Sequence, residues 1–457
     1  MKVLMFGWEF PPHISGGLGT ACYGITHSLI HEHTSVLFVA PKLYGDEPAE
    51  QTELISASEV PVVKIVSSTS VKEQVIVEEK EEGYLAIEKK PFIERIEVSS
   101  SLLPYQITTV EEVVYEIEQW NYRFKKIQET KTMLVTENSV EKQSTIYSFT
   151  GGYGSQLIKE VYRYAEVAAT IAAENEFDVI HVHDWMTFPA GIAAKKISGK
   201  PLVVHVHATE HDRALNGGDR HVFNIEKQGM EEADRVVAVS QWTKDLIIAR
   251  YHIPEEKIAV VHNGIMISDE DKHPSSTSPV GSHVVTFLGR ITHQKGPRYF
   301  VDAAQMVLTR FPDTHFVMAG SGDLLPQIIE RVARFKLSSR FHFTGFLKKK
   351  EINRVLSFSN AYVMPSVSEP FGITPLEAVH AGVPVIISNQ SGVAEVMEHA
   401  LKVDYWDSKA LANAICGILQ YESLSTTLKK NGGNEIKEIT WNKAAKKLNA
   451  IYHELVK

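Results

Sequence analysis

The chain has 457 residues, of which 44% are hydrophobic and 23% are charged, and its formal net charge is -9. These proportions are ordinary for a globular protein of two or three domains. The negative balance argues against nucleic acid as a partner, because no basic excess exists to neutralise a phosphate backbone.

Two cysteines, Cys22 and Cys416, lie far apart in the sequence. Such sparse usage excludes a disulfide framework and a cysteine metal site, and it indicates a reducing compartment. The N-terminus is interrupted too early by Gly, Glu and Pro to read as a signal peptide, and no apolar run approaches the length of a membrane span. We therefore expect a cytoplasmic protein without a membrane span.

Strand-like and helix-like runs alternate over most of the chain, which predicts an α/β fold with parallel sheets. In the first half, β-branched and apolar runs predict strands at 2–7, 35–41, 178–184, 201–208, 235–240 and 258–264. Residues 42–150 break this rhythm: 71–90 alternates polar and β-branched positions as edge strands do, and 109–128 is predicted to be a helix. We interpret this region as an elaboration of a first domain.

A polar, Pro/Ser-rich stretch at 268–282 predicts a connection between two domains. Its "DED" (269–271) superficially resembles a divalent-metal motif, but an acidic, solvated loop is the favoured interpretation. The strand pattern then restarts, with strands predicted at 283–290, 314–320, 340–346, 361–365 and 384–389. The predicted domains are 1–267 together with a C-terminal helix at 440–457, and 268–439.

Several predicted strands in the first half end in loops whose residues could bind a ligand or take part in catalysis. "GWEFPPHISGGLG" places Gly16 and Gly17 before a helix, where backbone amides can approach a phosphate, although a tight turn would use the same residues. Asp184 and His207 each end a buried strand. The histidines His181, His183, His205 and His207 invite a metal interpretation, but alternation sends 205 and 207 to one face rather than around an ion, so structural or substrate-binding roles are favoured.

The second half offers cations and carboxylates at strand ends. "FLGRITHQKG" puts Arg290 and Lys295 where both can converge on a diphosphate, and "GSGD" (320–323) and "TGFL" (344–347) add glycine-bearing strand exits. "PSVSEPFGITPLEA" (365–378) reads as strand exit, loop and helix. Its Thr374 is predicted as the N-cap, with Glu377 completing a capping box, whereas Glu369 has no such local role.

The amides of Gly372, Ile373 and Thr374 are expected to point out of that helix start, as a site for phosphate. Amides that bind phosphate, flanked by two carboxylates that can accept hydrogen bonds from hydroxyls, match the chemical groups of a sugar nucleotide. Ligands of open α/β sheets bind at the carboxyl ends of the strands, so these loops are expected to line one cleft between the two halves.

These motifs, above all "SEPFGITPLEA" with the paired Arg290 and Lys295, resemble the retaining glycosyltransferases of family 4, with the glycogen and starch synthases as close relatives. The resemblance covers both halves except roughly residues 42–150. It implies a GT-B fold, in which two Rossmann-like domains with parallel sheets face a central cleft and the last helix crosses back to the first domain. It also implies an acceptor-side first domain and a second domain that binds a nucleotide sugar.

The resemblance further implies roles for single residues. Arg290 and Lys295 would bind the donor diphosphate and stabilise the departing nucleotide, Glu369 would contact the sugar hydroxyls, and Glu377 would contact the ribose. The remaining implied contacts are His207 at the reacting centre, Asp184 near the acceptor, Gly16 and Gly17 on the diphosphate, and Gly372, Ile373, Thr374 and Phe346 in the donor site.

The activity implied is transfer of glucose from ADP- or UDP-glucose to the non-reducing end of an α-1,4-glucan with retention of configuration, without a metal. Trp8, Phe10 and Trp185 could stack on glucan rings or pack in the core. One departure concerns the donor: the bacterial synthases carry K-x-G-G, and here Ile14 and Ser15 precede Gly16. Transfer to another acceptor, a nucleotide-sugar 2-epimerase and a silent binding module are the alternatives.

Overall fold

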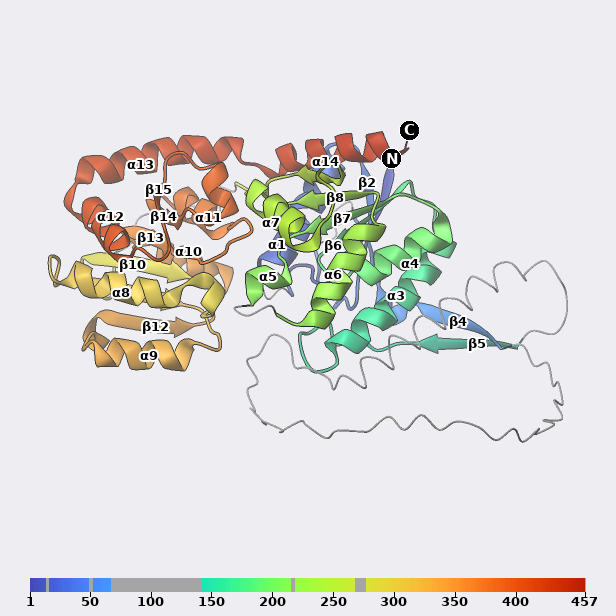
Figure 1. Cartoon of the computed structure of the whole chain (residues 1–457), viewed down its shortest axis with the longest axis horizontal. Coiled ribbons are helices and arrows are strands. Elements are labelled where there is room, and N and C mark those ends of the chain that lie inside the picture. The colour runs from blue at the N-terminus through green and yellow to red at the C-terminus, as the bar shows by residue number, and fades with distance from the viewer. Residues whose placement is uncertain (14–15, 49–51, 67–140, 215–217, 268–276, 457) are drawn as a thin grey trace, which may run out of the picture.

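The computed structural model describes residues 1–13, 16–48, 52–66, 141–214, 218–267 and 277–456. These residues form two α/β domains that lie side by side in Figure 1, the N-terminal one in blue to green and the C-terminal one in yellow to red. No helix among them is both long and apolar enough to cross a membrane.

The N-terminal domain is built on a seven-stranded parallel sheet with the order β3-β2-β1-β6-β7-β8-β9. Runs such as "VLMF" and "LVVHV" are rich in the apolar and β-branched residues that favour a sheet buried on both faces. The strands are β1 (Lys2–Phe6), β2 (Ser35–Ala40), β3 (Glu53–Ser56), β6 (Val179–His183), β7 (Leu202–Val206), β8 (Arg235–Ala238) and β9 (Ile258–Val260).

Side-chain alternation gives this sheet two apolar faces. Val3, Met5, Val179 and Val203 share a buried cluster with residues of two helices, α1 (Gly17–His31) and α14 (Trp441–Val456). Leu4, Phe6, Ile180 and Val182 belong to the cluster on the opposite face. The helices contributing to that cluster are α3 (Leu157–Glu174), α4 (Phe188–Ser198), α6 (Arg220–Glu232) and α7 (Gln241–Tyr251); the short α5 (Glu210–Arg213) follows β7.

The C-terminal domain repeats the plan with six parallel strands in the order β12-β11-β10-β13-β14-β15. They are β10 (His283–Leu288), β11 (Thr314–Ala319), β12 (Phe341–Gly345), β13 (Ala361–Met364), β14 (Val385–Ser388) and β15 (Leu401–Val403). Its helices are α8 (Pro297–Leu308), α9 (Leu325–Arg334), α10 (Lys349–Ser357), α11 (Thr374–His380), α12 (Ser408–Gln420) and α13 (Glu422–Glu435).

Two chain segments cross between the domains, and they run beside each other. The Ile265 amide donates to the Ile439 carbonyl at 3.0 Å, and Ile265 also pairs with Thr440. The chain then enters α14, which lies along the N-terminal domain in Figure 1. Trp441 at its start is 2% exposed and packs on Gly24 of α1, where any Cβ would sit about 2.5 Å from the indole. The last helix therefore returns to the first domain, as the resemblance implied.

The α/β fold with two parallel sheets is confirmed. All eleven strands predicted from the sequence form, with no boundary shifted by more than four residues. β3 and β15, both short strands at sheet edges, escaped prediction because three or four residues give little periodic signal. A separate antiparallel pair joins β4 (Pro61–Val66) to β5 (Glu141–Ile146). The alternating stretch 71–90, the helix predicted at 109–128 and the "DED" at 269–271 lie outside the described residues.

Candidate active site between the domains

Strand order reverses once in each sheet, between β1 and β6 and between β10 and β13. Loops that leave the carboxyl ends of two such strands diverge to opposite faces and open a crevice, which is the usual ligand site of this architecture. The loops after these four strands carry Gly16 and Gly17, Asp184, Arg290 and Lys295, and Glu369 respectively. The topology therefore brings candidates scattered over 350 residues to two sheet edges.

In the C-terminal domain, the loops after β10 and β13 are in direct contact. Lys295 Nζ lies 2.6 Å from Glu369 Oε2, and the Ser366 hydroxyl donates to the same oxygen at 3.0 Å. Gly296, with φ of 65°, makes this approach possible, because a Cβ there would lie 2.0 Å from the Pro365 carbonyl oxygen. Glu369 is 6% exposed, so Lys295 and Ser366 supply the partners that a buried side chain of this kind requires.

Arg290 sits differently from Lys295. It follows β10 and is exposed, and its guanidinium has no ion-pair or hydrogen-bond partner within the described part of the chain. The two cations predicted to act together therefore differ: Lys295 is held by a carboxylate, whereas within the described residues all five donors of Arg290 remain available. Lys295 is half-buried, and the carboxylate that holds it is buried.

The predicted capping box at α11 is wrong. The helix begins at Thr374 rather than after it, Ile373 precedes it with helical dihedral angles, and no side chain caps its first turn. The Thr374 hydroxyl instead bonds with Tyr362. Burial raises the pKa of Tyr362, and the charges of Glu369 and Glu377 raise it further, which places both carboxylates around this one phenol beneath the loop. Gly372, with φ of 97°, supplies the left-handed turn before the helix.

In the N-terminal domain, Asp184 organises the exits of β6 and β7. Its backbone is left-handed, with φ of 59°, and its Oδ1 accepts from the amides of His207 at 2.7 Å and Ala208 at 3.2 Å. Asp184 Oδ2 faces Arg213 Nη2 at 3.6 Å. Asp184 thus fixes the loop that carries His207.

A buried polar network behind this loop was not found from the sequence. Arg213 Nη1 donates to Glu226 Oε1 at 3.1 Å, Arg213 Nη2 donates to the Ala208 carbonyl at 3.0 Å, and Glu226 also pairs with the Tyr251 hydroxyl. Burial raises the pKa of Glu226 to about 8, against the lowering effect of Arg213. Glu226 lies in the middle of α6 and belongs to no recognisable motif. Its hydrogen bonds to residues after β7 therefore could not be predicted from the sequence.

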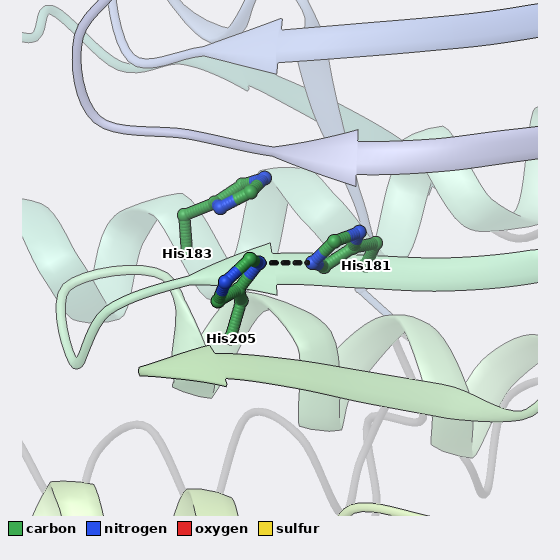
Figure 2. A group of neighbouring side chains, drawn as sticks. All are labelled: His181, His183 and His205. Atoms are coloured by element: carbon green, nitrogen blue, oxygen red, sulfur yellow. Dashed lines mark hydrogen bonds between the residues drawn. The ribbon is translucent and has the colours of Figure 1, made fainter. Parts of the chain in front are cut away.

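The four histidines lie on the α1/α14 face of the sheet, as alternation predicted for 205 and 207. His205 and His207 stack with ring centroids 4.3 Å apart, and His181 and His183 stack at 4.5 Å. Figure 2 shows His181 and His205 joined edge to edge, His181 Nε2 to His205 Nδ1 at 3.2 Å, with His183 to one side. Burial lowers the pKa of His181 to about 3 and the pKa values of His183 and His205 well below the ordinary range.

The ring nitrogens of His181, His183 and His205 come within 4.8 Å of one another, which is the spacing of a loose metal site. The arrangement nevertheless favours hydrogen bonding, because stacked imidazoles direct their lone pairs side by side rather than toward one point. The His181–His205 bond also occupies one nitrogen of each ring.

The two domains touch through the loop that carries Glu369. The adjacent Ser368 donates to Asp212 Oδ1 of α5 at 2.6 Å, and the Trp242 indole donates to Ser368 at 3.3 Å. Ile373 packs against buried clusters of both domains. Asp212 caps the turn that begins two residues after His207, so this contact sets the Glu369 loop of one domain against the His207 loop of the other.

A second contact fixes the domains at α7. Glu395, on the 3-10 helix Gly392–Glu395, accepts from the amides of Gln241 at 2.9 Å and Trp242 at 2.8 Å and pairs with His262 at 2.7 Å. Burial alone would raise the pKa of Glu395, but these hydrogen bonds lower it below its ordinary value. A carboxylate of one domain thus caps a helix of the other.

The other donor-site candidates lie at the expected strand ends. Gly16 precedes α1 in extended backbone, and a Cβ at Gly16 or Gly17 would meet nothing within 4 Å, so packing inside the chain does not require glycine at either position. Phe346 follows β12 and is 65% exposed. The aromatic residues proposed to stack on sugar do not do so: Trp8, Phe10 and Trp185 are 0–3% exposed and pack in the core.

Comparison with known proteins agrees with this geometry. Residues 142–269 match the family model "Glycosyltransferase Family 4", and residues 268–435 match "Glycosyl transferases group 1". An uncharacterized glycosyltransferase of Methanocaldococcus jannaschii is 31% identical over 50% of this chain and 62% of its own length. A glycogen synthase of Mycobacterium tuberculosis is 30% identical over 48% of this chain and 54% of its own. The matched part thus spans less than two thirds of either relative.

Among solved structures, HepE of Anabaena in complex with UDP-glucose superposes with a TM-score of 0.62 at 16% identity, covering 98% of this chain and 100% of its own. At that identity the likeness concerns the fold alone, which is the GT-B arrangement of two Rossmann-like domains. Residues 142–435 are thus similar to two glycosyltransferase family models, in a chain with the GT-B fold.

Proposed function

We propose that the protein is a retaining glucosyltransferase that moves glucose from ADP- or UDP-glucose to the non-reducing end of an α-1,4-glucan in the cytoplasm. The observation that carries the proposal is the Glu369 loop. It holds Lys295 at 2.6 Å and follows β13, the neighbour of the strand that Arg290 follows. Through Ser368 it contacts α5 of the other domain, the helix that comes just after His207 in the chain. This arrangement supports a site in which cations and a carboxylate of one domain face the other domain.

The donor is proposed to lie across both switch points. Arg290 and Lys295 bind its diphosphate, with the amides of Gly372, Ile373 and Thr374 on one side and those of Gly16 and Gly17 on the other. Glycine at 16 and 17, which internal packing does not require, is explained by a phosphate that approaches the backbone. The ribose is assigned to Glu377, and the nucleobase to the exposed ring of Phe346.

Catalysis is proposed to rest on electrostatics. As the glycosidic bond breaks, negative charge grows on the leaving diphosphate and the sugar becomes oxocarbenium-like. Fixed cations at Arg290 and Lys295 stabilise that charge without rearrangement, and His207 lies beside the reacting centre, with Asp184 near the acceptor. Attack from the face that the diphosphate leaves gives retention of configuration.

A second acceptor class is favoured by one observation. Because Trp8, Phe10 and Trp185 are buried, these three rings do not support a glucan acceptor. The glucan assignment therefore rests on the family resemblance and on the similarity to a glycogen synthase. Transfer of a hexose to another acceptor is therefore the runner-up function for the same site.

The two glutamates are predicted to separate by phenotype. Glu369→Gln should lower transfer at least tenfold with little change in nucleotide affinity, because Glu369 is assigned to the sugar. Glu377→Gln should weaken binding of free UDP or ADP, measured by calorimetry, because it loses a charge-assisted bond to the ribose. The matched control is Glu330→Gln, at an exposed pair on α9. Nucleotide affinity equal to wild type in Glu377→Gln would remove the ribose assignment.

Nucleotide release tests the proposed activity. The protein is incubated with ADP-, UDP- and GDP-sugars, with and without glycogen, in buffer with or without a chelator. We expect release from ADP- or UDP-glucose that rises with glycogen and survives the chelator, because the diphosphate already has two cationic side chains. Activity that disappears with the chelator and returns with manganese would contradict the metal-free mechanism, and release from no donor would contradict the function.

A further inference from the structure

Among the described histidines, His183 hydrogen-bonds His207 from the neighbouring strand. His183 Nδ1 lies 2.9 Å from His207 Nε2, and the rings stand 5.2 Å apart at 35°. His183 is completely buried on β6, whereas His207 is partly exposed at the end of β7. The contact therefore links a buried residue of the sheet to the histidine that begins the loop leading to α5, the helix that contacts the other domain.

The direction of this hydrogen bond follows from burial. Burial lowers the pKa of His183 well below its ordinary range, so the ring is neutral and carries one proton. His183 Nε2 is buried and has no hydrogen-bond partner in the described residues. A buried N–H without a partner is rarer in proteins than an unpartnered acceptor. The proton thus belongs on Nδ1, and His183 donates to His207 Nε2.

The protonation of His207 is fixed in turn. Its Nε2 accepts from His183, so a neutral His207 carries its proton on Nδ1, which has no hydrogen-bond partner within the described residues. Burial lowers the pKa of His207, and the Asp184 carboxylate opposes this. The other titratable group on the ring is His205, which stacks on His207 with ring centroids 4.3 Å apart and whose own pKa is lowered by burial. Arg213 and the Cys22 thiol act on Asp184 rather than on the ring itself.

We propose that His183 is a positioning residue that holds His207 as the neutral Nδ1–H tautomer, ready to donate to an oxygen of the substrate. The role in transfer rests on the proposed function of the site. A neutral His207 favours the transition state, because an imidazolium at this position would repel the positive charge that develops on the oxocarbenium-like sugar. With its Nε2 lone pair engaged by His183, His207 resists protonation and offers one donor of defined direction.

Two substitutions separate this role from simple packing. In His183→Asn the side-chain amide takes the position of Nδ1 and keeps the donor, whereas His183→Leu fills similar space without one. We expect His183→Asn to stay within about threefold of wild-type kcat and His183→Leu to lose about tenfold or more, with KM little changed. The kcat of His183→Leu should also fall between about pH 8 and about pH 6, where an unrestrained histidine gains its proton. Equal kcat in the two variants would overturn the proposal.

The tautomer is measurable without substrate. In protein with ¹⁵N-labelled histidine, long-range proton–nitrogen spectra distinguish Nδ1–H from Nε2–H rings, and the His207 signals are assigned by their loss in His207→Gln. We expect Nδ1–H for His207 and for His183. An Nε2–H ring at His207 would overturn the proposal even if the variants did not fold. If the tautomers are as predicted but the protein uses no nucleotide sugar, the proposed function is wrong and the role of His183 in fixing the His207 tautomer still holds.

Discussion

Arg290→Ala and Lys295→Ala are each expected to lower turnover on the order of a hundredfold or more, the usual effect of removing one preorganised donor from developing charge. Both cations are assigned to the leaving diphosphate, whose charge grows only as the bond breaks. The loss should therefore appear in kcat rather than in KM alone. Steady-state kinetics with ADP- and UDP-glucose measure it.

The two variants should differ in stability. Arg290 has no partner among the described residues, so Arg290→Ala should leave the unfolding free energy nearly unchanged. Lys295→Ala removes the cation from Glu369, which is buried, and should destabilise the fold by a few kcal/mol. Arg334→Ala, at an exposed pair on α9, is the control for both measurements. Wild-type turnover in either active-site variant would refute the diphosphate assignment.

Acidification is the second change expected to have a large effect, through the buried histidines. In the unfolded chain, histidines take up protons below about pH 6.5. In the folded state His181, His183 and His205 stay neutral there, because burial lowers the pKa of His181 to about 3 and the pKa values of the other two well below the ordinary range. The unfolded state then binds more protons, so stability present above about pH 6.5 is lost as the pH falls toward the folded values. Each such histidine costs about 2 kcal/mol between about pH 7 and about pH 5.

Urea unfolding at the two pH values measures this loss. His205→Asn removes one titrating group and should reduce the acid-induced loss by about 2 kcal/mol, whatever its own stability near neutral pH. His33→Asn is the matched control, because His33 is exposed and asparagine tolerates its left-handed backbone, with φ of 62°. A loss of stability of the same size in His205→Asn and wild type would contradict this account, because it would show that His205 takes up no proton on unfolding.

The sequence predicted the sheets well because their strands are buried on both faces and read as continuous apolar runs. It also placed Arg290, Lys295 and Glu369 at strand ends, where the switch point of the C-terminal sheet lies. Strand order itself, which makes those ends adjacent, depends on pairing between distant segments and had no local signal.

The misses have related causes. The pattern T-P-L-E at 374–377 satisfies the capping-box rule, yet the Thr374 hydroxyl binds Tyr362 from the neighbouring strand, so a tertiary contact overrides the local one. The pairing of Lys295 with Glu369 and the capping of α7 by Glu395 join residues 74 and more than 150 positions apart. Trp8 and Trp185 each come directly after a strand, a position that an exposed, ligand-binding aromatic residue could equally occupy. Only the packing of the folded chain shows that both lie in the hydrophobic core.

The central claim is transfer of glucose to an α-glucan, and the product tests it most directly. Glycogen is incubated with ADP- or UDP-glucose labelled in the sugar, and the polymer is then digested with an amylase specific for α-1,4 bonds. We expect the label to enter glycogen and to be released by the amylase, and Arg290→Ala to abolish both. Label found only in an organic-solvent extract, or in a product that resists the amylase, would contradict the glucan assignment while leaving the GT-B fold in place.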